Sequence, residues 1–334
     1  MTAAARRCRP RLLLALLLAL AAACDERAPP LIEGHPGGPY RMTLTLAPPQ
    51  PQAGQLTQLT WHLTHAASGM PVQDLQVLHE RVIHNFIVKR DFSSFAHIHH
   101  EDFRALTAAD LAAGSFTLPY RFPSAGSYRV VSEFAHRDRG WSKHFDVDVG
   151  GPPPPPVPAV DRGRTRTVGA YHASLRVSPD PLVAGYESEL VLELSRAGQP
   201  VTDLALYLGV EVHVALWRDD GSEFGHTHSY TPHMAAMLHA MHDADADPTA
   251  HARQLADMMV QMMNMPPELV FRGPRIPVHY VFPAPGLYHV FLQCAPGGTP
   301  QVFAFVLEVA AYAEGMQTRI ESVLDSSAAM SPVP

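Results

Sequence analysis

Residues 122–131 read FPSAGSYRVV, and residues 282–291 read FPAPGLYHVF. In both stretches a turn rich in Pro and Gly leads into apolar and β-branched residues, the pattern of a turn that enters a β-strand. The element F-P-x-x-G-x-Y places a tyrosine at the start of that strand, where β-sandwich domains often use a tyrosine to tie down a corner. The two stretches therefore predict the same strand in two copies of one domain.

The repetition extends over most of the chain. Residues 40–54 match residues 171–185, and residues 71–100 match residues 200–229, both without a gap. The offset between the copies rises from 129 in the second of these blocks to 160 in the F-P-x-x-G-x-Y element. The second copy is therefore expected to carry an insertion of 31 residues after about Ser229.

Each copy contains about seven short apolar or alternating stretches separated by turns, which is typical of an immunoglobulin-like sandwich. The predicted fold class is all-β, with two tandem immunoglobulin-like β-sandwich domains, the second with a helical-hairpin insertion. We place the first domain at residues 38–149 and the second at 165–311. Residues 150–164 form the linker, and its five consecutive prolines, 152–156, favour an extended and semi-rigid spacer.

The insertion, residues 230–266, holds eight of the 13 methionines. Met234, Met237 and Met241 fall on one helical face, so a helical hairpin is predicted. Three interpretations stay open: adaptable packing, a thioether site or lid for Cu(I), and a surface for a partner protein.

The N-terminus has the features of an export signal. A basic region is followed by an apolar run that is too short to span a membrane, so residues 1–23 are expected to be a signal peptide. Small residues directly before Cys24 favour a lipoprotein, with Cys24 lipidated, over plain secretion. Residues 24–37 would then be a tether and residues 312–334 a short helix or loose tail. The expected location is the cell envelope, lipid-anchored, on the periplasmic or outer face.

Charge and cysteine content exclude several classes of protein. Removal of the four N-terminal arginines leaves 21 basic against 32 acidic residues, which argues against a nucleic-acid partner. If Cys8 is removed and Cys24 lipidated, Cys294 has no disulfide partner, and its apolar surroundings predict a small buried side chain. No histidine follows Cys294, so a blue copper site is also excluded.

Three histidines recur at the same place in both copies: His84, His97 and His99, and His213, His226 and His228. In an extended H-x-H segment both imidazoles lie on one face, and a third on a neighbouring strand completes a three-nitrogen site. Imidazole suits copper and zinc among other ions. Auxiliary candidates are His79, His100, His233, Met234, Met237 and Met241.

Two other interpretations of the histidines remain. The histidines could form a buried hydrogen-bond network without a metal. The distance between ring nitrogens distinguishes this network from a metal site, since ligands of one ion must converge within about 3–4 Å. Three histidines with an open position could also activate water, with Glu80 or Glu101 as base. No catalytic motif supports a specific reaction, so the chain is not expected to be an enzyme.

The histidines belong to a longer pattern, D-L-x-x-x-H-E-x-x-x-H followed by D-x-S-x-F-x-H-x-H-P. The first copy contains Asp74, Leu75, His79, Glu80, His84, Asp91, Ser93, Phe95, His97 and His99, with His100 in place of the last Pro. With F-P-x-x-G-x-Y, this resembles an uncharacterised family of exported bacterial proteins. More loosely, the domains resemble YtkA-like and other immunoglobulin-like envelope modules associated with copper handling. The resemblance implies a heavy-metal context and a partner in metal efflux or metalloprotein assembly.

These observations lead to one functional hypothesis and one alternative. The hypothesis is a membrane-anchored periplasmic protein that binds a transition metal, copper first and zinc second, for sequestration or delivery. The alternative is a structural or protein-interaction lipoprotein of the envelope without a metal.

Overall fold

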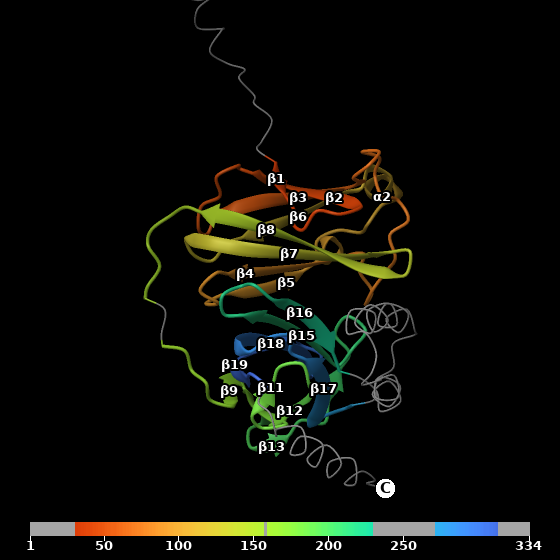
Figure 1. The fold of residues 1–334 in the computed structure, drawn as a ribbon. Helices are drawn as coiled ribbons and strands as arrows, with labels where there is room; N and C mark the ends of the chain where they lie inside the picture. The colour runs from red at the N-terminus through yellow and green to blue at the C-terminus, as the bar shows by residue number, and fades with distance from the viewer. Residues whose placement is uncertain (1–30, 157–158, 230–270, 313–334) are drawn as a thin grey trace, which may run out of the picture.

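The computed structural model describes residues 31–156, 159–229 and 271–312. Figure 1 shows two β-rich bodies, one above the other, joined by an extended connection. The first copy is defined here as residues 31–151 and the second copy as residues 159–312. Within the described residues, no helix is both long and apolar enough to cross a membrane.

The first copy consists of two four-stranded sheets, in the orders β1-β2-β3-β6 and β5-β4-β7-β8. Their strands are β1 (Ile32–Glu33), β2 (Tyr40–Ala47), β3 (Leu56–His65), β4 (Ile83–Lys89), β5 (Phe95–Ile98), β6 (Ser115–Arg121), β7 (Gly126–His136) and β8 (Arg139–Val149). A 3-10 helix, η1 (His100–Asp102), and the short helix α2 (Ala108–Ala113) connect β5 to β6. Thr107 caps α2 in a box with Asp110, and Gly114 ends the helix at a φ of 57°.

The second copy repeats this arrangement with extra short strands. One sheet has the order β13-β12-β10-β9, with β17 also paired to β12, and the other has the order β11-β19-β18-β15-β16, with β14 paired to β18. The strands are β9 (Thr165–Val168), β10 (Tyr171–Ser178), β11 (Leu182–Val183), β12 (Glu187–Arg196), β13 (Gln199–Pro200), β14 (Leu204–Ala205), β15 (Val212–Arg218), β16 (Phe224–His228), β17 (Arg275–Val281), β18 (Gly286–Pro296) and β19 (Gln301–Ala310).

In each copy the two sheets enclose an apolar core, which makes each a β-sandwich. The strand order β2-β3-β6 against β5-β4-β7-β8 corresponds to the immunoglobulin arrangement. The predicted tyrosine corner is confirmed in both copies, because the Tyr128 hydroxyl donates to the Ser124 carbonyl and the Tyr288 hydroxyl to the Ala284 carbonyl, each over 2.8 Å. Cys294 is free and fully buried in the second core, as predicted, and burial raises its pKa to about 12.

The two copies pack against each other through equivalent sheets. In Figure 1, β4 and β5 of the first copy lie next to β15, β16 and β18 of the second. Apolar side chains of both copies form one cluster there, in which Phe95 stacks on Phe291 with ring centres 4.4 Å apart. Every residue of β4 is buried, since one face meets the first core and the other meets the second copy. This explains why the sequence of β4 is nearly continuously apolar rather than alternating.

The predicted tether, residues 24–37, is wrong at its C-terminal end. Ile32 and Glu33 pair with β2, and the backbone N–H of His35 donates to the His144 carbonyl over 3.0 Å. Ile32 also packs against the first core, so the copy begins before residue 38. The predicted signal peptide, Cys24, the predicted Met-rich insertion at 230–266 and the residues after Tyr312 lie outside the described residues.

Candidate metal centre

The hairpin of β4 and β5 brings the first histidine triplet together. His84 lies on β4, His97 on β5 and His99 just after it, and the antiparallel register places Phe86 opposite His97. Nδ1 of His84, Nε2 of His97 and Nε2 of His99 are each 3.0 Å from the other two. All three side chains are buried. The separation is within the 3–4 Å range that the metal interpretation requires.

The outer nitrogen of each ring faces an oxygen acceptor. The His84 ring N–H donates to the Leu78 carbonyl over 2.9 Å, that of His97 to the Gln293 side-chain oxygen over 2.8 Å, and that of His99 to the Asp102 carboxylate over 2.9 Å. A neutral imidazole carries one hydrogen, so each inner nitrogen presents a lone pair. Three lone pairs that converge at 3.0 Å cannot hydrogen-bond to one another, and they form a donor set that could hold a cation.

The surroundings of the three rings disfavour protonation of the nitrogens that form the triangle. Burial, followed by the neighbouring His99, holds the pKa of His84 well below its usual value, and burial does the same for His97. Burial also lowers the pKa of His99, although the adjacent Asp102 carboxylate opposes this. The rings are therefore neutral near pH 7, the form in which histidine binds metals.

The second triplet occupies the equivalent positions on β15 and β16, in a looser arrangement. Nε2 of His226 lies 3.4 Å from Nδ1 of His213 and 3.0 Å from Nε2 of His228. The His213 ring N–H donates to the Leu208 carbonyl over 3.3 Å, and that of His226 to the Glu133 carboxylate over 2.7 Å. His213, His228 and His79 also offer ligand atoms that all lie within 4.8 Å of one another.

The outer hydrogen bonds cross between the copies in a reciprocal way. Glu133 lies opposite His84 in the β4–β7 pair, and Gln293 lies opposite His213 in the β15–β18 pair. Yet Glu133 binds His226 of the second copy, and Gln293 binds His97 of the first. Each triplet is therefore oriented partly by the other copy.

The sequence placed one triplet in each half, and the structure brings both to the same interface. The ring centres of His97 and His213 are 5.5 Å apart, and those of His84 and His226 are 5.9 Å apart. Phe86 stacks on His97 and also contacts the His226 ring edge-on. The six histidines thus form two adjacent clusters beside one apolar patch.

The auxiliary candidates have different positions. His79 of the first copy lies beside the second triplet, with its ring centre 4.0 Å from that of His228. His100 lies away from both triplets, next to Phe116, and its Nδ1 accepts from the Thr117 backbone N–H over 3.2 Å. Because His100 starts the turn after β5, its ring points towards β6 rather than the interface. His233, Met234, Met237 and Met241 lie outside the described residues.

The two carboxylates considered as bases are engaged or exposed. Glu101 accepts a hydrogen bond from the Val82 backbone N–H over 3.1 Å. The Glu80 side chain is more than half exposed and lies 3.9 Å from the Arg81 guanidinium.

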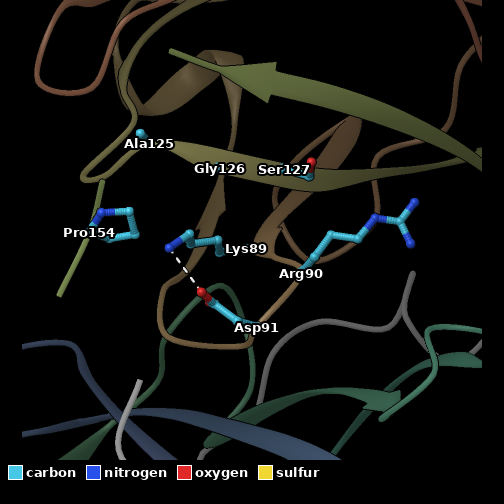
Figure 2. Close-up of a pocket in the computed structure, with 7 residues that line it drawn as sticks. All are labelled: Lys89, Arg90, Asp91, Ala125, Gly126, Ser127 and Pro154. Carbon is cyan, nitrogen blue, oxygen red and sulfur yellow. Dashed lines mark ion pairs between the residues drawn. The ribbon is translucent and has the colours of Figure 1, made fainter. Parts of the chain in front are cut away.

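A surface pocket lies apart from the histidines, where the linker passes the first copy. Figure 2 shows it between Pro154, the turn before β7 and the end of β4. The Lys89 ammonium, which is almost fully buried, points at the Asp91 carboxylate 2.9 Å away. This pairing neutralises the buried cation in the pocket wall.

Three residues that orient the histidines were not predicted: Glu133, Gln293 and Asp102. Glu133 and Gln293 occupy equivalent positions at the offset of 160, a signal visible in the repeat. Asp102 follows His99 by three residues and also accepts from the His99 backbone N–H over 2.9 Å, as a capping residue does.

The chain belongs to a family described as a domain of unknown function, DUF8832, whose profile matches twice, at residues 37–151 and 166–311. The duplication is thereby confirmed. No curated protein matches the sequence.

Among solved structures, the Escherichia coli adhesin FdeC is 12% identical with a TM-score of 0.22, covering 80% of this chain and 64% of its own. The Yersinia pseudotuberculosis adhesin InvE is 9% identical with a TM-score of 0.22, and the match covers 80% of this chain and 58% of the InvE chain. The chain thus spans less than two thirds of either adhesin. Because TM-scores of this size do not define a common arrangement, the sandwich assignment rests on strand order.

Proposed function

We propose that the protein binds transition-metal ions, copper first and zinc second, through the two histidine triplets. The proposal rests on the triangle of His84, His97 and His99, in which three lone-pair nitrogens converge at 3.0 Å while every outer nitrogen is held by an oxygen acceptor. Metal-bound histidines characteristically donate their second N–H to a carboxylate or carbonyl in this way.

The donor set fits these ions. Ligands of a tetrahedral ion with bonds of about 2.0 Å lie about 3.3 Å apart, so the triangle needs to open by only a few tenths of an ångström. An all-imidazole set suits copper and zinc, and the general order of stability places copper(II) above zinc. The buried histidines favour slow exchange, and we therefore place sequestration or delivery in the cell envelope ahead of catalysis.

Calorimetric titration of the metal-free chain with Cu(II) or Zn(II) tests the proposal. We expect uptake at micromolar concentration, and loss of one ion per chain when His97 and His99 are replaced by Ala. The control is His172→Ala, because His172 is exposed on β10 and contacts only Thr167 among the hydrogen bonds described. Cu(I) is tested in parallel under reductant. If none of these ions gives heat or remains bound, the proposal is wrong and the chain is a structural module without a metal.

A second expectation concerns Glu133, whose carboxylate fixes the ring of His226. Glu133→Ala should weaken metal binding at the second triplet about 10- to 100-fold, the usual cost of losing an outer-shell partner. Glu133→Gln should largely retain affinity, because glutamine serves the equivalent histidine, His97, at position 293. Equal losses in the two variants, measured by competition with a chromophoric chelator, would contradict a positioning role for Glu133.

A further inference from the structure

His79 occupies a tight turn that precedes β4. Leu78 and Arg81 exchange two backbone hydrogen bonds, of 2.8 and 2.9 Å, and His79 and Glu80 between them have φ values of 43° and 65°. The second copy has the same turn between Tyr207 and Val210, with Leu208 and Gly209 at φ values of 52° and 78°. His79 and Leu208 are therefore structural equivalents.

The His79 ring crosses the interface and joins the second triplet. Its centre lies 4.0 Å from that of His228 and 5.2 Å from that of His213. His79 is 8% exposed, and burial lowers its pKa to about 3, so its ring is neutral near pH 7. Its Nε2 is buried and has no hydrogen-bond partner. His79 thus brings a buried ring nitrogen without a hydrogen-bond partner to the second triplet.

His79 lies within reach of an ion shared with the second copy. One ring nitrogen from each of His79, His213 and His228 lies within 4.8 Å of the other two. The His213 ring is held in place by its hydrogen bond to the Leu208 carbonyl over 3.3 Å. One ring from the first copy therefore lies beside two from the second.

We propose that the interface holds two ions of unequal coordination: a three-imidazole site at His84, His97 and His99, and a four-imidazole site at His213, His226, His228 and His79. The first site has no fourth imidazole because the equivalent of His79 is Leu208. The four-imidazole site is completed only when the two copies are docked, so its ion clamps them together. This inference rests on the proposed function and adds the number of ions, their ligands and the role of His79.

Four imidazoles close the coordination shell of a tetrahedral ion, whereas three leave one position open. The closed site is therefore expected to be structural and to exchange slowly. The open site is expected to accept an exogenous ligand and to release its ion first.

The experiment is a titration of the wild-type chain and of His79→Leu with Co(II) and Zn(II), followed by optical absorption and calorimetry. The Leu substitution copies the residue found at the equivalent position of the second copy. We expect two ions per wild-type chain and, in His79→Leu, a loss of at least about tenfold in affinity for one of them, because losing even an outer-shell partner costs that much. Glu80→Gln, the exposed neighbour in the same turn, is the matched control and should bind like wild type.

The outcomes are distinguishable. Two ions in wild type with unchanged affinities in His79→Leu would overturn this inference and leave the proposed function standing, as would a single ion per chain. No ion at all would overturn both. If His79→Leu folds poorly, His79→Gln, which keeps a polar side chain but no imidazole, provides the same comparison.

Discussion

Acidification of the metal-free chain from pH 7 to pH 5.5 should lower its free energy of unfolding by several kcal/mol. Burial lowers the pKa of His79 to about 3 and holds those of His84, His97, His213 and His228 well below their usual value. In the unfolded chain these groups titrate near pH 6.5. Below that pH the unfolded state binds more protons than the native state, so stability is present above pH 6.5 and is lost as the pH falls.

The size of this effect follows from the number of groups. A histidine that stays neutral in the native state loses about 1 kcal/mol over the first pH unit below its unfolded pKa, so five lose on the order of 5 kcal/mol. His99 is left out of this sum because the carboxylate of Asp102 faces it. A total of this size is a large part of the 5–15 kcal/mol that stabilises a typical domain.

Urea unfolding at pH 7.5, 6.5 and 5.5, with chelator present, measures the effect. His172→Ala, which removes an exposed histidine, should leave the pH dependence unchanged. His79→Leu should reduce the slope by about 1 kcal/mol per pH unit, the share of one buried group. A free energy of unfolding that stays constant between pH 7 and 5.5 would show that these rings are not neutral and buried in solution.

Repeat and strand patterns predicted much of the fold. The duplication, the β-rich character and the corner tyrosines follow from F-P-x-x-G-x-Y and from alternating residues, because both signals are local. The predicted tether was wrong at its C-terminal end because Ile32 and Glu33 pair with β2, which lies further along the chain. A strand of two residues is too short to show an alternating pattern in the sequence. The near-continuous apolar sequence of β4 was recognised as a buried strand, but the pattern could not say that a second copy covers one of its faces.

The same limit applies to the histidines. H-x-H at a fixed spacing after His84 predicted the triplets, because the spacing is the property of one hairpin. Their meeting at one interface depends on how two sandwiches dock, and no local pattern encodes that. Glu133 and Gln293 were visible as equivalents in the repeat, but each serves a histidine of the other copy. His79 differs from its equivalent Leu208, but its position beside the second triplet becomes visible only when the two copies are packed together.

Phe86→Ala should destabilise the metal-free chain by about 3–5 kcal/mol, the usual cost of truncating a buried phenylalanine. Phe86 is fully buried in the cluster shared by the two copies, and its ring stacks on His97 with centres 4.2 Å apart. It also lies 5.3 Å from Phe224 and 4.7 Å from His226, centre to centre. One ring therefore supports both copies' histidines as well as the apolar contact between them.

Because Phe86 touches a histidine of each triplet, its loss should weaken metal binding at both sites, unlike the loss of any single ligand. Phe86→Leu keeps most of the apolar volume and should cost less than about 1.5 kcal/mol, provided that the neighbours repack. Phe103→Ala, at a phenylalanine that is 47% exposed, is the matched surface control and should change stability by less than about 0.5 kcal/mol. Urea unfolding with chelator gives the stability and calorimetry gives the affinities. If Phe86→Ala behaved like the surface control, the two copies would not be packed together in solution, and the shared metal centre would have no support.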